Sequence, residues 1–140
     1  MQNLSAERSG SPSALVVEDD PSVRGLLTSQ LRHLGFRVSS APDFRGAAAL
    51  LAAERLDLVV TDLDLGQGRE GLEVVSLVKD GDAATRVVLV TGAGSIEIET
   101  EAVRRGADAY LEKPWTLGEL EETLAGIGWL GNRVSRTTAG

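Results

Sequence analysis

Residues 56–65 read LDLVVTDLDL, a short apolar run that ends in two closely spaced acidic residues. The run Leu58–Thr61 is rich in β-branched residues and shows no polar alternation, which is typical of a strand buried on both faces of a parallel sheet. Short strand-like runs recur along the chain at Ala14–Val17, Phe36–Ser39, Val87–Val90 and Ala109–Leu111. The sequence therefore predicts five short strands.

Helical patterns separate these strands. Apolar residues recur at helical spacing, and the expected helices cover residues 21–34, 44–55, 72–78, 95–105 and 117–127. Asp20-Pro21 suits a helix start, and Gly35 and Gly106 suit helix ends. This alternation predicts an α/β fold whose parallel sheet carries helices on both faces. Right-handed crossovers restrict it to a few doubly wound strand orders.

The composition is that of one acidic domain. The chain has 140 residues, 14 basic against 21 acidic, a formal charge of −7 at pH 7 and no cysteine. The absence of cysteine excludes disulfide scaffolds and Cys-based zinc sites. The acidic balance argues against nucleic-acid binding, and no apolar run reaches the ~18 residues of a membrane span. We expect a cytoplasmic protein with a disordered leader at 1–12, a folded domain at 13–130 and a tail at 131–140.

Polar side chains follow four of the five predicted strands at the point where each strand ends. They are Glu18, Asp19 and Asp20 after the first strand, Asp62 and Asp64 after the third, Thr91 after the fourth and Lys113 after the fifth. Ligands of an open parallel sheet bind beyond the carboxyl ends of its strands, where the strand order reverses. If the order is 2-1-3-4-5, these groups converge. Clustered carboxylates favour a cation such as Mg²⁺, and a carboxylate can act as a nucleophile toward phosphorus, so the set fits phosphoryl transfer.

Each of these residues also has a purely structural interpretation. Asp20 can be only a helix cap, Thr91 part of a turn, and Lys113 a surface charge. A single acidic residue most commonly lies in a solvated loop and has no functional role. Capping leaves Glu18 and Asp19 unexplained, however, and the chain has only two lysines. The joint pattern therefore favours a functional site.

Four stretches of the chain resemble the receiver domain of two-component response regulators. They are ALVVEDDPSVR (14–24), LDLVVTDLDL (56–65), VVLVTGAG (87–94) and ADAYLEKPW (107–115). They stand in the family's order, with 43 residues from Asp19 to Asp62, 29 more to Thr91 and 22 more to Lys113. The resemblance implies a flavodoxin-like (βα)5 fold with strand order 2-1-3-4-5, as in a stand-alone receiver.

The resemblance also implies the chemistry of the acidic residues. Asp62 would accept a phosphoryl group from a sensor histidine kinase or a histidine phosphotransfer protein. Mg²⁺ would be the cofactor, held by Glu18, Asp19, Asp62 and the backbone carbonyl of Asp64. The domain would promote its own phosphorylation and dephosphorylation without turning over an external substrate, so it would not be an enzyme.

The remaining family positions concern the phosphoryl contacts and the switch. Thr91 and Lys113 would contact the phosphoryl group, Thr91 and Tyr110 would form the switch, and the Lys113–Pro114 peptide bond would be cis. The family's signalling face corresponds to the helix at 95–105, the strand at 109–111 and the helix at 117–127.

We expect the output to be a contact with a protein. About ten residues follow the last helix, too few for a DNA-binding domain, unless the chain is a piece of a longer protein. The partner would be an unknown downstream target or, after phosphorylation, a second copy of the chain, with no nucleic acid and no membrane. We expect Tyr110, Trp115 and Trp129 near the signalling face as interface anchors.

The chain departs from the family pattern beside Asp62. Gly66 stands where the family usually has Pro, and the loop Gly66–Gly71 is longer than is common, so we expect a more mobile loop. By the resemblance, Asp64 and Ala93 correspond to two positions whose side chains in the family influence how water reaches the phosphoryl group. We expect Asp64 to change the lifetime of the aspartyl-phosphate, the alternative being a carboxylate that only faces solvent.

Three other interpretations remain open. The segment GQGREG at 66–71 is a literal dinucleotide-binding fingerprint, but it follows the third strand, and the acidic residue expected at the end of the next strand is missing. Asp62-Leu63-Asp64 matches the D-x-D of haloacid-dehalogenase-type phosphatases, although that motif follows the first strand there. The third is a receiver fold used as an unphosphorylated docking module.

Overall fold

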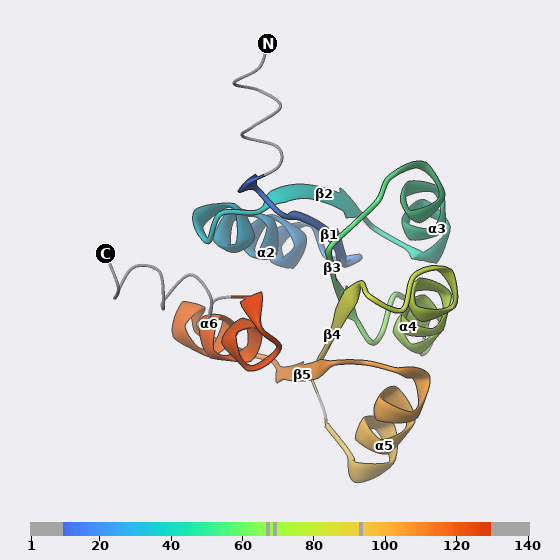
Figure 1. Cartoon of the computed structure of the whole chain (residues 1–140). Coiled ribbons are helices and arrows are strands. Elements are labelled where there is room, and N and C mark those ends of the chain that lie inside the picture. The colour runs from blue at the N-terminus through green and yellow to red at the C-terminus, as the bar shows by residue number, and fades with distance from the viewer. Residues whose placement is uncertain (1–9, 67, 69, 93, 130–140) are drawn as a thin grey trace.

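The computed structural model describes residues 10–66, 68, 70–92 and 94–129. Within these ranges, strands and helices alternate along the chain (Figure 1). The strands are β1 (Ser13–Val17), β2 (Arg37–Ala41), β3 (Leu58–Asp62), β4 (Arg86–Thr91) and β5 (Ala109–Glu112). The helices are α2 (Pro21–His33), α3 (Phe44–Ala53), α4 (Glu70–Gly81), α5 (Ile96–Arg105) and α6 (Leu117–Gly126).

The five strands form one parallel sheet in the order β2-β1-β3-β4-β5. Figure 1 shows α2 and α6 on one face of the sheet and α3, α4 and α5 on the other. The predicted doubly wound α/β fold with strand order 2-1-3-4-5 is therefore confirmed. The order reverses between β1 and β3, so the carboxyl ends of these two strands are where a ligand site is expected.

Two apolar layers hold the helices against the sheet. Successive strand residues point to opposite faces, so Leu15 and Val17 pack with α3, α4 and α5, whereas Ala14 and Val16 pack with α2 and α6. All four side chains are fully buried. Burial on both faces explains why the strands read as continuous apolar runs instead of alternating ones.

Local hydrogen bonds determine where the helices begin and end. The Asp20 carboxylate accepts a hydrogen bond from the Ser22 N–H (2.8 Å) at the start of α2, and the Ser95 hydroxyl accepts one from the Ile98 N–H (3.1 Å) at the start of α5. Gly106 ends α5 with φ 106°, a left-handed conformation that favours glycine. The predicted helix start at Asp20 and helix end at Gly106 are confirmed.

The predicted second strand is wrong at its boundaries, because β2 begins at Arg37. The Phe36 N–H donates to the Leu31 carbonyl (3.0 Å) at the end of α2. The Phe36 ring packs edge-on against Trp129, with ring centroids 5.7 Å apart and planes at 72°. Phe36 therefore belongs to the apolar layer between the sheet and α2 and α6, not to the hydrogen-bonded strand.

Most of the expected leader and all of the expected tail lie outside the described residues. Pro12, the last residue assigned to the leader, already joins the sheet, because its carbonyl accepts a hydrogen bond from the Arg37 N–H (2.8 Å). Of the helices in the described ranges, none combines the length and the apolar character that crossing a bilayer requires.

Candidate functional site

The loops after β1, β3, β4 and β5 surround a cavity of about 670 Å³ at the carboxyl edge of the sheet. The cavity lies beside the reversal of strand order between β1 and β3. Its lining residues are Glu18, Asp19, Asp20, Asp62, Leu63, Asp64, Gly66, Thr91, Gly92, Ile98 and Lys113. The structure thus brings together all the residues that the sequence suggested for a cation or a phosphoryl group.

Hydrogen bonds that continue the sheet fix the backbone of these residues. The Glu18 N–H donates to the Ala41 carbonyl (3.0 Å), so Glu18 extends β1 beyond its last strand residue. Asp62 is the last residue of β3. The Lys113 N–H donates to the Thr91 carbonyl (2.8 Å), which ties the lysine to the end of β4. The site is therefore built on rigid strand ends.

Three carboxylates form a cluster on one side of the cavity. Glu18, Asp19 and Asp62 each present an oxygen, and these oxygens all lie within 4.8 Å of one another. Glu18 is only 1% exposed and Asp62 only 5%, whereas Asp19 is exposed. Since buried like charges repel strongly, the cluster is suited to a cation that neutralises it.

Burial makes the Glu18 carboxylate hard to ionise. Loss of solvent raises the pKa of Glu18 from 4.5 to about 7, and the nearby Asp62 charge adds to the rise. The hydrogen bond from the Asp20 N–H (3.1 Å) and the charge of Lys113 act in the opposite direction. Glu18 Oε1 is buried and has no hydrogen-bond partner among the described residues. The positive group that faces this oxygen is the Lys113 ammonium, 3.4 Å away.

Lys113 is the cation that the cluster already contains. Its Nζ lies 3.3 Å from Asp62 Oδ2 and 3.4 Å from Glu18 Oε1. Burial raises the pKa of Asp62, and the charge of Lys113 opposes the rise. Burial also disfavours the charged lysine, but the two carboxylates outweigh that effect and raise the pKa of Lys113. One ammonium is thus shared between two buried carboxylates.

Thr91 and Tyr110 lie close together behind the cavity. Thr91 ends β4 and is buried. Burial raises the pKa of the Tyr110 hydroxyl, and the Thr91 side chain acts to lower it. Tyr110 packs with the apolar layer of α3, α4 and α5. The Lys113–Pro114 peptide bond, directly after β5, is cis.

The loop after β3 contains the departures from the family pattern. Gly66 has φ 99°, a value that the ring of a proline at this position could not adopt. Asp64 lines the cavity with an exposed side chain, and its backbone N–H helps to lower the pKa of Asp62. Ala93, the other position expected to tune the site, lies outside the described residues, as do Gln67 and Arg69 of the loop expected to be mobile.

Sequence reasoning missed two residues that support the site. Arg24, one turn into α2, donates through Nη1 to the Glu18 carbonyl (2.8 Å). Gly71, at the start of α4, donates its N–H to the Leu63 carbonyl (2.9 Å). The signal for Gly71 was present in the GxGxxG pattern, but that pattern suggested a nucleotide site.

The three aromatic residues expected near the signalling face pack on different faces of the sheet; α5 and α6 also lie on opposite faces, so their role as interface anchors stays a prediction. Tyr110 packs with the layer of α3, α4 and α5, whereas Trp115 and Trp129 pack with the layer of α2 and α6. The Trp115 indole N–H donates to Gln30 Oε1 of α2 (2.8 Å), and Trp129 packs on Phe36.

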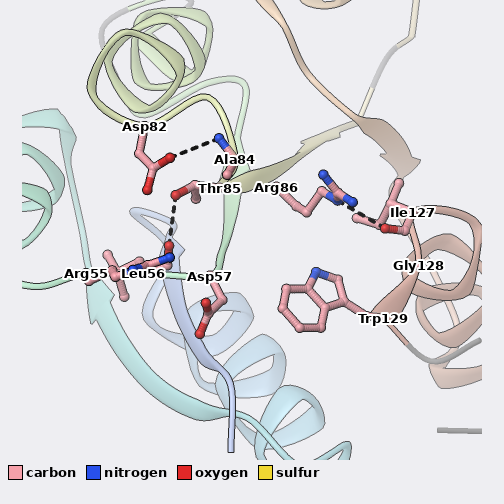
Figure 2. Close-up of a pocket in the computed structure, with 10 residues that line it drawn as sticks. All are labelled: Arg55, Leu56, Asp57, Asp82, Ala84, Thr85, Arg86, Ile127, Gly128 and Trp129. Atoms are coloured by element: carbon pink, nitrogen blue, oxygen red, sulfur yellow. Dashed lines mark hydrogen bonds between the residues drawn. The ribbon is translucent and has the colours of Figure 1, made fainter. Parts of the chain in front are cut away.

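A second cavity, of about 410 Å³, opens at the opposite edge of the sheet. Figure 2 shows its lining: Arg55, Leu56, Asp57, Asp82, Ala84, Thr85, Arg86, Ile127, Gly128 and Trp129. The Thr85 hydroxyl donates to the Leu56 carbonyl (2.8 Å) across it. None of the residues proposed for the chemistry lines this cavity.

Comparison with known proteins agrees with the site. The chain belongs to the response regulator receiver domain family, whose model matches residues 14–125. It is the CheY-like receiver domain of a two-component response regulator. It is similar to response regulator protein PilR of Pseudomonas aeruginosa, with 37% identity over 112 residues that cover 80% of this chain and 25% of PilR. It is also similar to nitrogen assimilation regulatory protein NtrX of Azorhizobium caulinodans, with 36% identity over 107 residues that cover 76% of this chain and 24% of NtrX.

Solved structures give the same assignment. A Burkholderia pseudomallei response regulator protein, crystallised with a phosphorylated aspartic acid, calcium ion and citrate, matches with a TM-score of 0.76 and 29% identity over 92% of this chain and 74% of that chain. Chemotaxis protein CheY4 of Vibrio cholerae matches with a TM-score of 0.76 and 28% identity, and the match covers 82% of this chain and 97% of the CheY4 chain. The chain spans about a quarter of the length of PilR and NtrX.

Proposed function

We propose that Asp62 accepts a phosphoryl group from a sensor histidine kinase or a histidine phosphotransfer protein, and that this event switches a protein-binding surface. One observation carries the proposal. The buried Asp62 carboxylate shares one cavity with the Glu18 and Asp19 carboxylates, and the Lys113 ammonium lies 3.3 Å from it. A nucleophile, a cation site and a positive charge for phosphoryl oxygens therefore meet at one place.

The chemistry is a transfer of phosphorus from nitrogen to oxygen. A carboxylate oxygen of Asp62 attacks the phosphorus of a phosphohistidine. The new O–P bond forms as the N–P bond breaks, and the imidazole nitrogen leaves with the electron pair and takes up a proton. Lys113 neutralises charge on the phosphoryl oxygens and the Thr91 hydroxyl donates to one of them. Water later attacks the phosphorus, the O–P bond to Asp62 breaks, and inorganic phosphate leaves while the Asp62 carboxylate is restored.

The donor set fits Mg²⁺. Three carboxylates converge within 4.8 Å, and the buried Glu18 Oε1 accepts no hydrogen bond among the described residues and has Lys113 Nζ at 3.4 Å as its ion-pair partner. Magnesium prefers oxygen ligands and binds through one or two carboxylates together with phosphate. Glu18, Asp19, Asp62 and the Asp64 backbone carbonyl would hold the ion. When bound, it supplies positive charge to the carboxylates and to the phosphoryl oxygens.

The proposed output is a change on α5, β5 and α6. Thr91 moves toward the phosphoryl group, and Tyr110 follows into the space that it leaves. Ile96 and Val103 lie two turns apart on α5 and are 83% and 65% exposed, so an apolar pair is available for a partner. The partner is a downstream protein or a second copy of the chain, without nucleic acid or membrane. A cytoplasmic location fits an ATP-dependent kinase as donor.

The proposal is tested by labelling with acetyl phosphate and detection by mass spectrometry. The wild-type protein should gain one phosphoryl group in the presence of Mg²⁺ and none in EDTA. Asp62→Asn should remain unlabelled. Asp82→Asn serves as the matched control, because Asp82 lines the other cavity and its amide can still accept the Ala84 N–H. Equal labelling of wild type and Asp62→Asn would refute the proposal.

The alternatives predict different results. A phosphatase of the D-x-D type would use Asp64, which lines the same cavity, as a general acid and would hydrolyse p-nitrophenyl phosphate in many turnovers. A docking module would show no labelling at all. We expect labelling of Asp62 and no steady turnover.

A further inference from the structure

The first turn of α4 rests directly on the backbone of the proposed phosphoacceptor. A Cβ atom added at Gly71 would fall on the Asp62 carbonyl oxygen and lie 2.6 Å from Leu63 Cα and 2.9 Å from the Asp62 carbonyl carbon. Real Cβ atoms essentially never approach other atoms below 3.0 Å. Only a glycine allows the helix to lie this close to the end of β3.

The strand cannot move away to make room for a side chain. β3 lies between β1 and β4 in the sheet, where Asp62 pairs with Val90, and the Leu63 N–H donates to the Val90 carbonyl (2.7 Å). A shift of Asp62 would break this pairing at the centre of the sheet. The helix would have to yield instead.

A shift of α4 would be transmitted to the site through the loop before it. The helix is anchored by a buried apolar face, which consists of Leu72, Val74, Val75 and Val78. The Gly71 N–H also donates to the Leu63 carbonyl (2.9 Å), so helix and strand end are coupled at the base of the loop. The loop carries Asp64 and Gly66, which both line the cavity. The placement of Asp64 and Gly66 therefore depends on the distance between α4 and β3.

We infer that Gly71 is a positioning residue for the cation site. Its missing side chain sets the distance between α4 and the Asp62–Leu63 peptide, and through it the placement of the Asp62 carboxylate and the Asp64 backbone. Gly71 itself touches neither the cation nor the phosphoryl group. The inference rests on the proposed function, because it concerns how the same site is held in shape.

The test compares two glycine-to-alanine variants of the same helix. In Gly71→Ala the new Cβ meets the Asp62 backbone, whereas in Gly81→Ala it meets nothing within 4 Å. Mg²⁺ affinity is measured by calorimetry on protein that is folded by circular dichroism. We expect at least a tenfold loss of affinity for Gly71→Ala and less than a twofold change for Gly81→Ala. Wild-type affinity in Gly71→Ala would overturn the inference.

Labelling by acetyl phosphate supplies a second readout. The Mg²⁺ concentration for half-maximal labelling should rise in Gly71→Ala by the same factor as the dissociation constant, while the rate at saturating Mg²⁺ changes less. A purely structural role would lower the melting temperature and leave the Mg²⁺ dependence as in wild type, which would refute the inference.

A measurement on the wild type covers the case in which Gly71→Ala does not fold. Mg²⁺ should slow hydrogen exchange of the Gly71 N–H, because binding and the contact with Leu63 stabilise the same arrangement. If the protein binds Mg²⁺ but the hydrogen-exchange rate of the Gly71 N–H does not change, the inference about Gly71 is refuted and the proposed function still stands. A wild type that neither binds Mg²⁺ nor becomes labelled would refute the proposed function as well.

Discussion

Removing the charge of one buried acid should change how stability depends on pH. Burial raises the pKa of Glu18 from 4.5 to about 7 in the folded protein. Each pKa unit is worth about 1.4 kcal/mol, so ionising Glu18 in the metal-free fold opposes folding by about 3 kcal/mol. This is a large share of the roughly 5–15 kcal/mol that stabilises a typical domain.

The sign follows from proton binding. Between pH 4.5 and about 7 the folded protein holds a proton on Glu18 that the unfolded chain has released. Stability of the metal-free protein therefore falls as the pH rises through this window and levels off above it. Asp62, whose pKa burial also raises, acts in the same direction. The hydrogen bond with Arg105 lowers the pKa of Glu101, but this shift changes stability only at pH values below the range in which Glu18 titrates.

The assay is thermal unfolding in EDTA at several pH values. Wild type should lose about 3 kcal/mol between about pH 5 and pH 8, which is roughly 10 °C in Tm for a domain of this size. Glu18→Gln should lose much less, and the exposed Glu122→Gln control should follow the wild type. Saturating Mg²⁺ should stabilise the wild type more at pH 8 than at pH 5, because only the ionised acid binds the cation. A wild-type profile that is flat, or that rises with pH, would refute the reasoning.

Three further outcomes follow from the packing, the caps and the site. Leu15→Ala should lower the free energy of unfolding by about 3 kcal/mol in urea titrations, because Leu15 is fully buried in the sheet, and a loss below about 1 kcal/mol would contradict that packing. Thr116→Ala should lower it by about 1 kcal/mol, since the Thr116 hydroxyl accepts the Glu119 N–H (3.1 Å) in a capping box, and no loss would show that the cap is dispensable. Asp64→Asn should change the rate at which labelled protein loses phosphate, measured by mass spectrometry over time, and an unchanged rate would remove the tuning role of Asp64.

The fold could be predicted because its signals are local. A continuous apolar run such as Leu58–Thr61 marks a strand buried on both faces, and the cap at Asp20 marks the helix that follows the first strand. In a parallel sheet all carboxyl ends share one edge, so the residue after each strand could be placed in the site without knowing the packing. Glu18, Asp62 and Lys113 meet for this reason.

The missed features depend on packing between distant segments. Nothing in the local sequence shows that α4 approaches the Asp62 backbone so closely that only Gly71 fits. Phe36 has high strand propensity, but its contact with Trp129 and its bond to Leu31 keep it outside β2.

The burial of Glu18 and Asp62 also has a consequence for protein engineering. Both acids oppose folding when they are ionised without a bound metal ion, because Lys113 only partly offsets their burial, so neutral replacements of similar size would raise the free energy of unfolding. Directed evolution for heat resistance in chelating buffer would enrich such replacements first. The most stable clones of that screen would lack the carboxylates proposed to bind Mg²⁺ and accept the phosphoryl group.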